Sequence, residues 1–156
     1  MRAAVPGYAI DDDPALVDGD AAWRYLSTEA YWERWRSREV FDAQVAGAWR
    51  VVGAYTEGGA EGGAEGGAMV GFARAFSDGA TAYLADVYVL PEHRGRGLAA
   101  AIVRLMVQDG PGADFRWMLH TADAHGLYAR FGFRPPDRSY LERPAPASRA
   151  ARRPGA

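Results

Sequence analysis

The middle of the chain carries its clearest pattern of hydrophobic and polar positions. Residues 83–89 form an almost unbroken run of β-branched, aromatic and small apolar side chains, which is typical of a strand covered on both faces. After a polar loop, apolar residues recur at helical spacing and place one apolar stripe along an α-helix: Leu98, Ala101, Ile102, Leu105 and Met106. Gly110, Pro111 and Gly112 then end the helix. The pattern therefore predicts a buried strand, a loop and an amphipathic helix in succession.

Shorter patterns predict the remaining elements. Strands are expected over residues 8–10, 49–55, 69–76, 81–89 and 115–120, and two more are expected to open at 131–133 and 139–142. Helices are expected over residues 21–26, 37–45 and 123–128, with Val40, Phe41 and Val45 on the buried face of the second. A turn at residues 77–79 would join two strands into an antiparallel hairpin, whereas a helical crossover would make strand 115–120 parallel to strand 83–89. We therefore expect an α+β fold of three layers around a mixed, mostly antiparallel sheet.

The length and composition favour one globular domain. The chain has 156 residues, of which 49% are hydrophobic, and this suits a single core spanning residues 1–142. The sequence Glu-Gly-Gly-Ala repeats three times over residues 57–68, so we expect a flexible hairpin loop there. From residue 143 to residue 156, Pro, Ala and Arg alternate without apolar periodicity, and this tail is expected to be disordered.

Charge and residue usage exclude several classes of function. The net charge of −2 provides no global basic field for nucleic acid or an anionic membrane. The absence of cysteine excludes disulfides, thiolate metal sites and a cysteine nucleophile. His120, Asp123 and His125 could ligate a metal, but they form a poor template across a strand-to-helix corner, so no metal is expected. No apolar run approaches a membrane span, which favours a cytoplasmic protein, and exposed tryptophans would be compatible with a homodimer.

A glycine-rich loop lies between the central strand and the amphipathic helix. In Arg94-Gly95-Arg96-Gly97-Leu98-Ala99, the glycines allow a tight turn that aims several backbone N–H groups at one point as the helix begins. This arrangement predicts a cradle for an anion, most simply a phosphate. The segment 95–100 also satisfies the dinucleotide pattern G-x-G-x-x-A, but residues 90–94 intervene between strand and glycine, and the remaining chain is too short for further parallel strands. A Walker loop is excluded because no Gly-Lys-Ser/Thr follows.

Two motifs resemble those of one enzyme family. Arg94-x-x-Gly97-x-Ala99, after the strand that ends at Val89, is similar to the acetyl-CoA motif of the GNAT N-acetyltransferases. The segment 127–133, Leu-Tyr-Ala-Arg-Phe-Gly-Phe, resembles a second motif of that family. Together they imply the GNAT acyl-CoA acyltransferase fold, in which a central pair of parallel strands splays apart, and acetyl-CoA as the acyl donor.

The resemblance also implies where acetyl-CoA would bind. Its pyrophosphate would sit on the backbone N–H groups of residues 96–99, and its pantetheine arm would run along residues 87–89, where one N–H group would polarise the thioester carbonyl. Thr121 stands where many members of the family have an asparagine that contacts the pantetheine, and His125 is expected near the cofactor. The expected cofactor-binding residues are therefore Val87, Tyr88, Val89, Arg94, Gly95, Arg96, Gly97, Leu98, Ala99, Thr121 and His125.

The chemistry needs a base for the acceptor amine and an acid for the departing thiolate. Asp86 is the first candidate for the base, because a carboxylate on a buried strand is costly unless it is used or paired, and a structural role is the alternative. His120 or a water relay could act in its place. Tyr128 matches the general acid of the family.

The acceptor site is expected in an aromatic segment near the N-terminus. There Tyr31, Trp32 and Trp35 would form a wall of the pocket, or else a helix junction packed on the core. The leading hypothesis is an N-acetyltransferase that acts on a small amine. The alternatives are a non-catalytic domain that binds or senses acyl-CoA, and an acetyltransferase that acts on a protein or peptide amine.

Overall fold

A computed structural model of the protein describes residues 1–30, 36–58 and 67–143. Across these residues, six strands form one sheet in sequence order: β1 (Arg2–Val5), β2 (Tyr8–Asp11), β3 (Arg50–Thr56), β4 (Met69–Ser77), β5 (Thr81–Val89) and β6 (Arg116–Met118). The α-helices are α1 (Gly19–Thr28), α2 (Arg38–Ala46), α3 (Leu98–Val107) and α4 (His125–Ala129), and short 3-10 helices η1 and η2 cover Pro14–Leu16 and Pro91–His93. None of these helices is long and apolar enough to cross a membrane.

The sheet is mixed, and its last two strands, β5 and β6, diverge after a short stretch of pairing. The strands β1 to β5 pair with their neighbours in antiparallel fashion, whereas β5 and β6 are parallel. This last pairing covers only Thr81–Tyr83 against Arg116–Met118, so residues 84–89 of β5 have no described strand on that side. The expected mixed sheet with a splayed parallel pair is confirmed.

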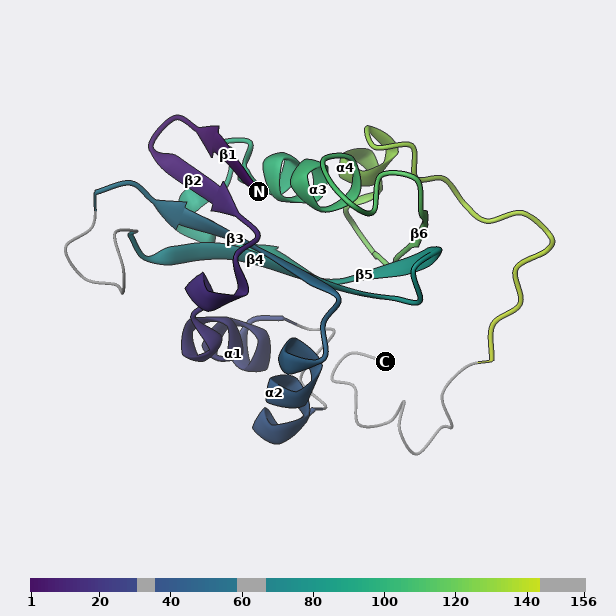
Figure 1. Ribbon diagram of the computed structural model, residues 1–156, viewed down its shortest axis with the longest axis horizontal. Coiled ribbons are helices and arrows are strands. Elements are labelled where there is room, and N and C mark those ends of the chain that lie inside the picture. The colour runs from purple at the N-terminus through teal and green to yellow at the C-terminus, as the bar shows by residue number, and fades with distance from the viewer. Residues whose placement is uncertain (31–35, 59–66, 144–156) are drawn as a thin grey trace.

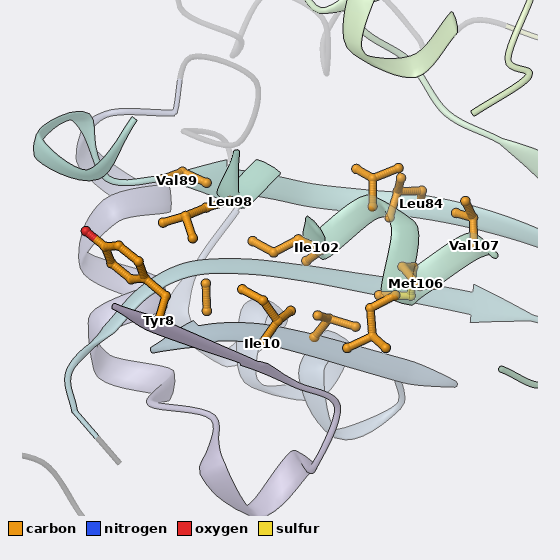
Figure 2. Close-up of a cluster of buried hydrophobic side chains, with 14 of the residues drawn as sticks. Tyr8, Ile10, Leu84, Val89, Leu98, Ile102, Met106 and Val107 are labelled. Carbon is orange, nitrogen blue, oxygen red and sulfur yellow. The ribbon is translucent and has the colours of Figure 1, made fainter. Parts of the chain in front are cut away.

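Helices cover both faces of the sheet, so the fold has the three layers that the pattern predicted. The helices α3 and α4 lie on one face, and α1 and α2 lie on the other (Figure 1). Under α3, side chains from β2, β4 and β5 meet the apolar stripe of the helix, and Ile10, Leu84, Ile102 and Met106 are all at most 3% exposed (Figure 2). The opposite core contains Leu26, Phe41 and Phe72, each fully buried.

The helix α2 buries a narrower face than the sequence suggested. Phe41 is fully buried, but Val40 is 40% exposed, so its assignment to the buried face was wrong. Successive helical residues are about 100° apart, and a helix that directs Phe41 at the sheet therefore turns Val40 toward solvent. Val45 follows Phe41 by one turn and is partly buried against the same core.

The two strands expected after α4 do not form. The N–H groups of Phe131 and Phe133 both bond to the carbonyl of Tyr128, and Gly132 adopts a left-handed φ of 82° that allows this helix end. The backbone of residues 131–133 is thus satisfied by α4 rather than by β6. Residues 137–140 form a turn instead, in which the N–H of Tyr140 bonds to the Asp137 carbonyl and the N–H of Ser139 bonds to the Asp137 carboxylate. Residues 141–142 have no regular secondary structure.

One buried arginine ties the sheet to the end of α3. Arg50 donates to the Asp12 carboxylate at 2.7 and 3.1 Å, and also to the carbonyls of Met106 and Asp109 at 3.0 Å. Burial alone would raise the pKa of Asp12, but hydrogen bonds and charges from the chain's amino group and Arg50 outweigh it and hold that pKa below its ordinary value. The charged form of Asp12 therefore stabilises the fold.

We expect Asp12→Asn to lower the free energy of unfolding at pH 7 by about 1–2 kcal/mol, allowing for solvent screening of the ion pair. Because the folded-state pKa is depressed, this stabilisation is present above the unfolded pKa near 3.8 and is lost as the pH falls through the folded value. Denaturant unfolding of both proteins at pH 7 and near pH 3 measures the difference. A difference that is as large at the lower pH would refute the assignment. Asp20→Asn, which removes an exposed partner of Arg38, is the control and should change little.

Candidate active site

The glycine-rich loop has the conformation that its sequence requires. After η2, Gly95 and Gly97 adopt left-handed φ values of 75° and 83°, and α3 begins directly after Gly97. A Cβ atom at either glycine would meet no protein atom within 4 Å. The backbone conformation, rather than crowding by the protein, therefore explains why glycine stands at both positions.

The loop and the first turn of α3 present a row of free backbone donors. The first backbone hydrogen bond of the helix runs from the N–H of Ala101 to the carbonyl of Gly97, at 3.0 Å. No acceptor from the described chain faces the N–H groups of residues 95–100. Five of these six residues, all except Arg96, line a hollow of about 180 Å³, whose full lining is Val89, His93, Arg94, Gly95, Gly97, Leu98, Ala99, Ala100, Leu127 and Arg130. The donors and the positive end of the helix dipole suit a pyrophosphate.

The two loop arginines have different surroundings. Arg94 donates to the carbonyl of Val89 at 2.9 Å and to the hydroxyl of Tyr25 at 2.8 Å, so it fastens the loop to the end of β5 and to α1. Arg96 is exposed, and its guanidinium lies 5.9 Å from the ring of Tyr8. Both side chains are exposed, but Arg94 lines the hollow and Arg96 does not.

Sequence reasoning missed several residues of this hollow. His93 lines it and accepts or donates a hydrogen bond with the hydroxyl of Tyr8 at 2.8 Å. Leu127 and Arg130 reach it from α4 and its C-terminal end. Both belong to the second family motif, so the assumption that the two motifs meet in space would have identified them.

The pairing of β5 with β4 is irregular near the point where β5 and β6 diverge. Phe72 pairs with Tyr88 and Arg74 pairs with Ala85, so two residues of β5, Asp86 and Val87, face a single residue of β4. This is a β-bulge, and Asp86 has a φ of 57°, the only positive φ of a non-glycine residue in the described chain. The bulge distorts the backbone at the position where the thioester carbonyl is expected.

Asp86 is enclosed by arginines. Its Oδ2 atom accepts from Arg74 at 2.5 Å and from Arg36 at 3.1 Å, and the side chain is fully buried. No hydrogen-bond donor in the described chain reaches its Oδ1 atom, which is also buried. An acceptor amine has no access to this carboxylate in the conformation observed.

Tyr128 and His120 come from different elements: Tyr128 lies in α4, and His120 follows β6. Tyr128 is 8% exposed and packs edge-on against Phe133. Burial, with smaller effects of the charges of Asp123 and Tyr83, raises the pKa of Tyr128 to about 12. His120 follows β6, is exposed, and has its Nδ1 atom 2.7 Å from the hydroxyl of Tyr83. Its other nitrogen, Nε2, lies 3.8 Å from the carboxylate of Glu142.

The remaining predicted site residues do not contact the hollow, or lie outside the described residues. Thr121 accepts from the N–H of Ala124 at 3.0 Å and so supports the start of α4, while His125 is exposed at the first position of that helix. Neither lines the hollow. Tyr31, Trp32 and Trp35 lie outside the described residues. Within the described ranges, no group of three His, Asp or Glu side chains could hold a metal ion.

The splayed sheet and the donor-lined hollow are the features expected of an acyltransferase. A family model described as "Acetyltransferase (GNAT) domain" matches residues 50–135, and the chain belongs to this family of acetyltransferases. The matched region contains the bulge, the glycine-rich loop and Tyr128.

Individual proteins agree with this assignment. A solved GNAT-family structure from Xanthomonas campestris pv. campestris has 36% identity and a TM-score of 0.76, with 92% of this chain and 96% of that chain covered. A curated Gibberella zeae protein with acetyltransferase in its name is 29% identical over 140 residues, which is 79% of this chain and 76% of that protein. The solved glucosamine-6-phosphate N-acetyltransferase of Arabidopsis thaliana shares the fold at 11% identity, with a TM-score of 0.57 over 87% of this chain and 97% of that chain.

We expect Gly97→Val to abolish the binding of acetyl-CoA or to weaken it by more than about tenfold. A β-branched residue does not tolerate the left-handed conformation, so the loop must rearrange and turn its N–H groups away from the hollow. Calorimetric titration with acetyl-CoA measures the change.

Gly79→Val is the matched control, because Gly79 also has a left-handed φ, 94°, and open space around it, but it lies in the β4–β5 turn. Both variants should lose similar stability, and only Gly97→Val should lose affinity. Equal affinity in the two variants would show that the loop does not hold the ligand.

Proposed function

We propose that this protein is a cytoplasmic enzyme that transfers the acetyl group of acetyl-CoA to an amine of a small molecule by direct attack on the thioester. One observation supports this most strongly. The free N–H groups of residues 95–100 lie beyond one end of β5, and the open edge of β5 extends back from that end to Leu84. A ligand whose phosphates bind the loop could therefore lay its extended pantetheine arm along the open edge of β5.

The open edge of β5 suits the pantetheine arm. Alternate residues of a strand direct their N–H and C=O groups to the same side, and along residues 84–89 that side has no described partner strand. The amide groups of pantetheine can pair with Val87 and with the N–H of Val89, whose carbonyl accepts from Arg94. The thioester then lies beside the bulge, where the backbone N–H of Val87 polarises its carbonyl.

His120 is better placed than Asp86 to act as the base. It is exposed, whereas Asp86 is enclosed by two guanidinium groups. A lysine-like amine has a pKa of about 10 and is protonated at neutral pH, so a proton must leave before attack. In this step the imidazole takes the amine proton directly or through water, the nitrogen attacks the carbonyl carbon, and the C–S bond breaks.

Tyr128 is proposed to protonate the departing thiolate. With its pKa near 12 and a free thiol near 8.5, the transfer is uphill by about 5 kcal/mol if the thiolate is solvated as in water. The same burial that weakens the phenol as an acid also raises the pKa of a thiol beside it. The transfer is therefore less costly beside this buried phenol than these solution values suggest.

A small acceptor agrees with the Arabidopsis glucosamine-6-phosphate N-acetyltransferase, which shares the fold and by its name modifies a small amine. Turnover of acetyl-CoA with a panel of small amines, followed by release of the free thiol, tests the proposal. Binding of acetyl-CoA without turnover on small amines or peptides would favour the non-catalytic alternative. Turnover on peptides alone would favour the protein-modifying one.

We expect Tyr128→Phe to lower kcat by at least about tenfold, since general acid catalysis contributes at least that much. The affinity for acetyl-CoA should stay within about twofold, because the ring and its packing against Phe133 are kept. Tyr55→Phe is the control, since Tyr55 is another buried tyrosine with a raised pKa whose hydroxyl has no described partner. An unchanged kcat in Tyr128→Phe would remove Tyr128 from the mechanism.

A further inference from the structure

The bulge in β5 needs something to hold it. Leu84 and Val89 both enter the core under α3, although they are five residues apart and would face opposite sides of a regular strand. The extra residue of the bulge returns Leu84 and Val89 to the same face of the sheet. It also forces Asp86 to adopt an unfavourable left-handed φ. A glycine would adopt this conformation freely, so the choice of Asp points to its side chain.

The side chain of Asp86 is the centre of a buried ion cluster. Its carboxylate binds Arg74, the β4 residue at which the register shifts, and Arg36, which precedes α2. The side chains of Asp86 and Arg36 are 0% exposed and that of Arg74 is 7% exposed. Arg36 also bonds to Gln44 of α2, and its guanidinium lies 5.1 Å from the ring of Phe41. The cluster thus connects the helical layer, β4 and the bulge.

General stability is a poor explanation for such a cluster. Burying charges costs solvation that their mutual attraction only partly returns, and well-packed apolar side chains at the same positions are often as stable or more so. An apolar side chain cannot, however, fix the angle of a carboxylate and, through it, the backbone that carries it. A directional cluster is therefore useful where a backbone conformation must be held closely.

We propose that Arg74 and Arg36 are positioning residues that act through Asp86 to hold the bulge, and with it the N–H group that polarises the thioester carbonyl. This inference rests on the proposed function, since it assigns the cluster to that same acetyl-transfer site. Without the cluster, the left-handed residue loses its support, β5 shifts toward regular pairing with β4, and the N–H at Val87 turns away from the open edge. Phosphate binding at residues 95–100 does not depend on this orientation.

The test is infrared spectroscopy of acetyl-CoA labelled with ¹³C at the acetyl carbonyl. In the unaltered protein, the carbonyl band should shift to lower frequency on binding, because a hydrogen bond polarises the C=O group. In Arg74→Met most of this shift should be lost, and kcat should fall by about tenfold or more. The affinity for CoA, which lacks the carbonyl, should remain within about twofold.

Two further variants make the test specific. Arg50→Met removes another buried arginine with carboxylate and carbonyl partners, away from the bulge, so it should lose stability and keep the shift. Arg74→Lys keeps a cation beside Asp86 and should retain more of the shift than Arg74→Met, and it carries the test if the latter does not fold.

The outcomes separate the two claims. A full carbonyl shift in both Arg74 variants would overturn the positioning role and leave the proposed function intact. Loss of the shift in Arg50→Met as well would also overturn it, because any loss of stability would then have the same effect. If the unaltered protein bound no acetyl-CoA, the proposed function would fail and this inference with it.

Discussion

The structure depends on one hydrogen-bonding constraint: β5 pairs with β4 on one side, interrupted only by the bulge, and with β6 over three residues on the other. Strand edges in a protein interior are costly when their N–H and C=O groups find no partner. Here the short contact with β6 keeps the two strands together at one end, and the divergence beyond Tyr83 leaves an edge that another extended chain can complete. The fold thus provides a binding surface made of backbone, which depends little on the identity of the side chains along it.

Two parts of that edge are built differently. Just beyond the C-terminal end of β5, free N–H groups and a helix dipole favour negative charge, and at the bulge, in the middle of the open edge, a buried carboxylate is paired with two guanidinium groups. In the proposed function, the first arrangement contributes affinity for the donor and the second fixes the orientation of the backbone. This division explains why the loop is glycine-rich and exposed, whereas the bulge is charged and enclosed.

The sequence predicted the elements whose signals are local. The apolar run at 83–89 and the stripe of α3 each occupy one short segment, and both appear where expected. The strands expected after α4 failed because Gly132 lets residues 131–133 bond back to Tyr128, a competition that hydrophobic pattern does not reveal. The sequence also did not reveal that β6 pairs with β5 over only three residues. The length of that pairing depends on how segments far apart in the sequence diverge in space.

The site was predictable by residue type but not by partner. A buried carboxylate at Asp86 had to be either used or paired, yet its partners lie 50 and 12 residues away, at Arg36 and Arg74. Arg94 was correctly placed at the loop, but its contact with Tyr25 crosses 69 residues and could not be read from the motif.

That contact couples two layers of the fold. Arg94 joins the glycine-rich loop to α1 through Tyr25, and Tyr25 in turn stacks on Tyr88 of β5, with ring centroids 4.2 Å apart. The loop on one face of the sheet and the helix on the other are therefore not independent modules. A substitution at Tyr25 would act on both at once, because one side chain holds the guanidinium of Arg94 and covers the ring of Tyr88.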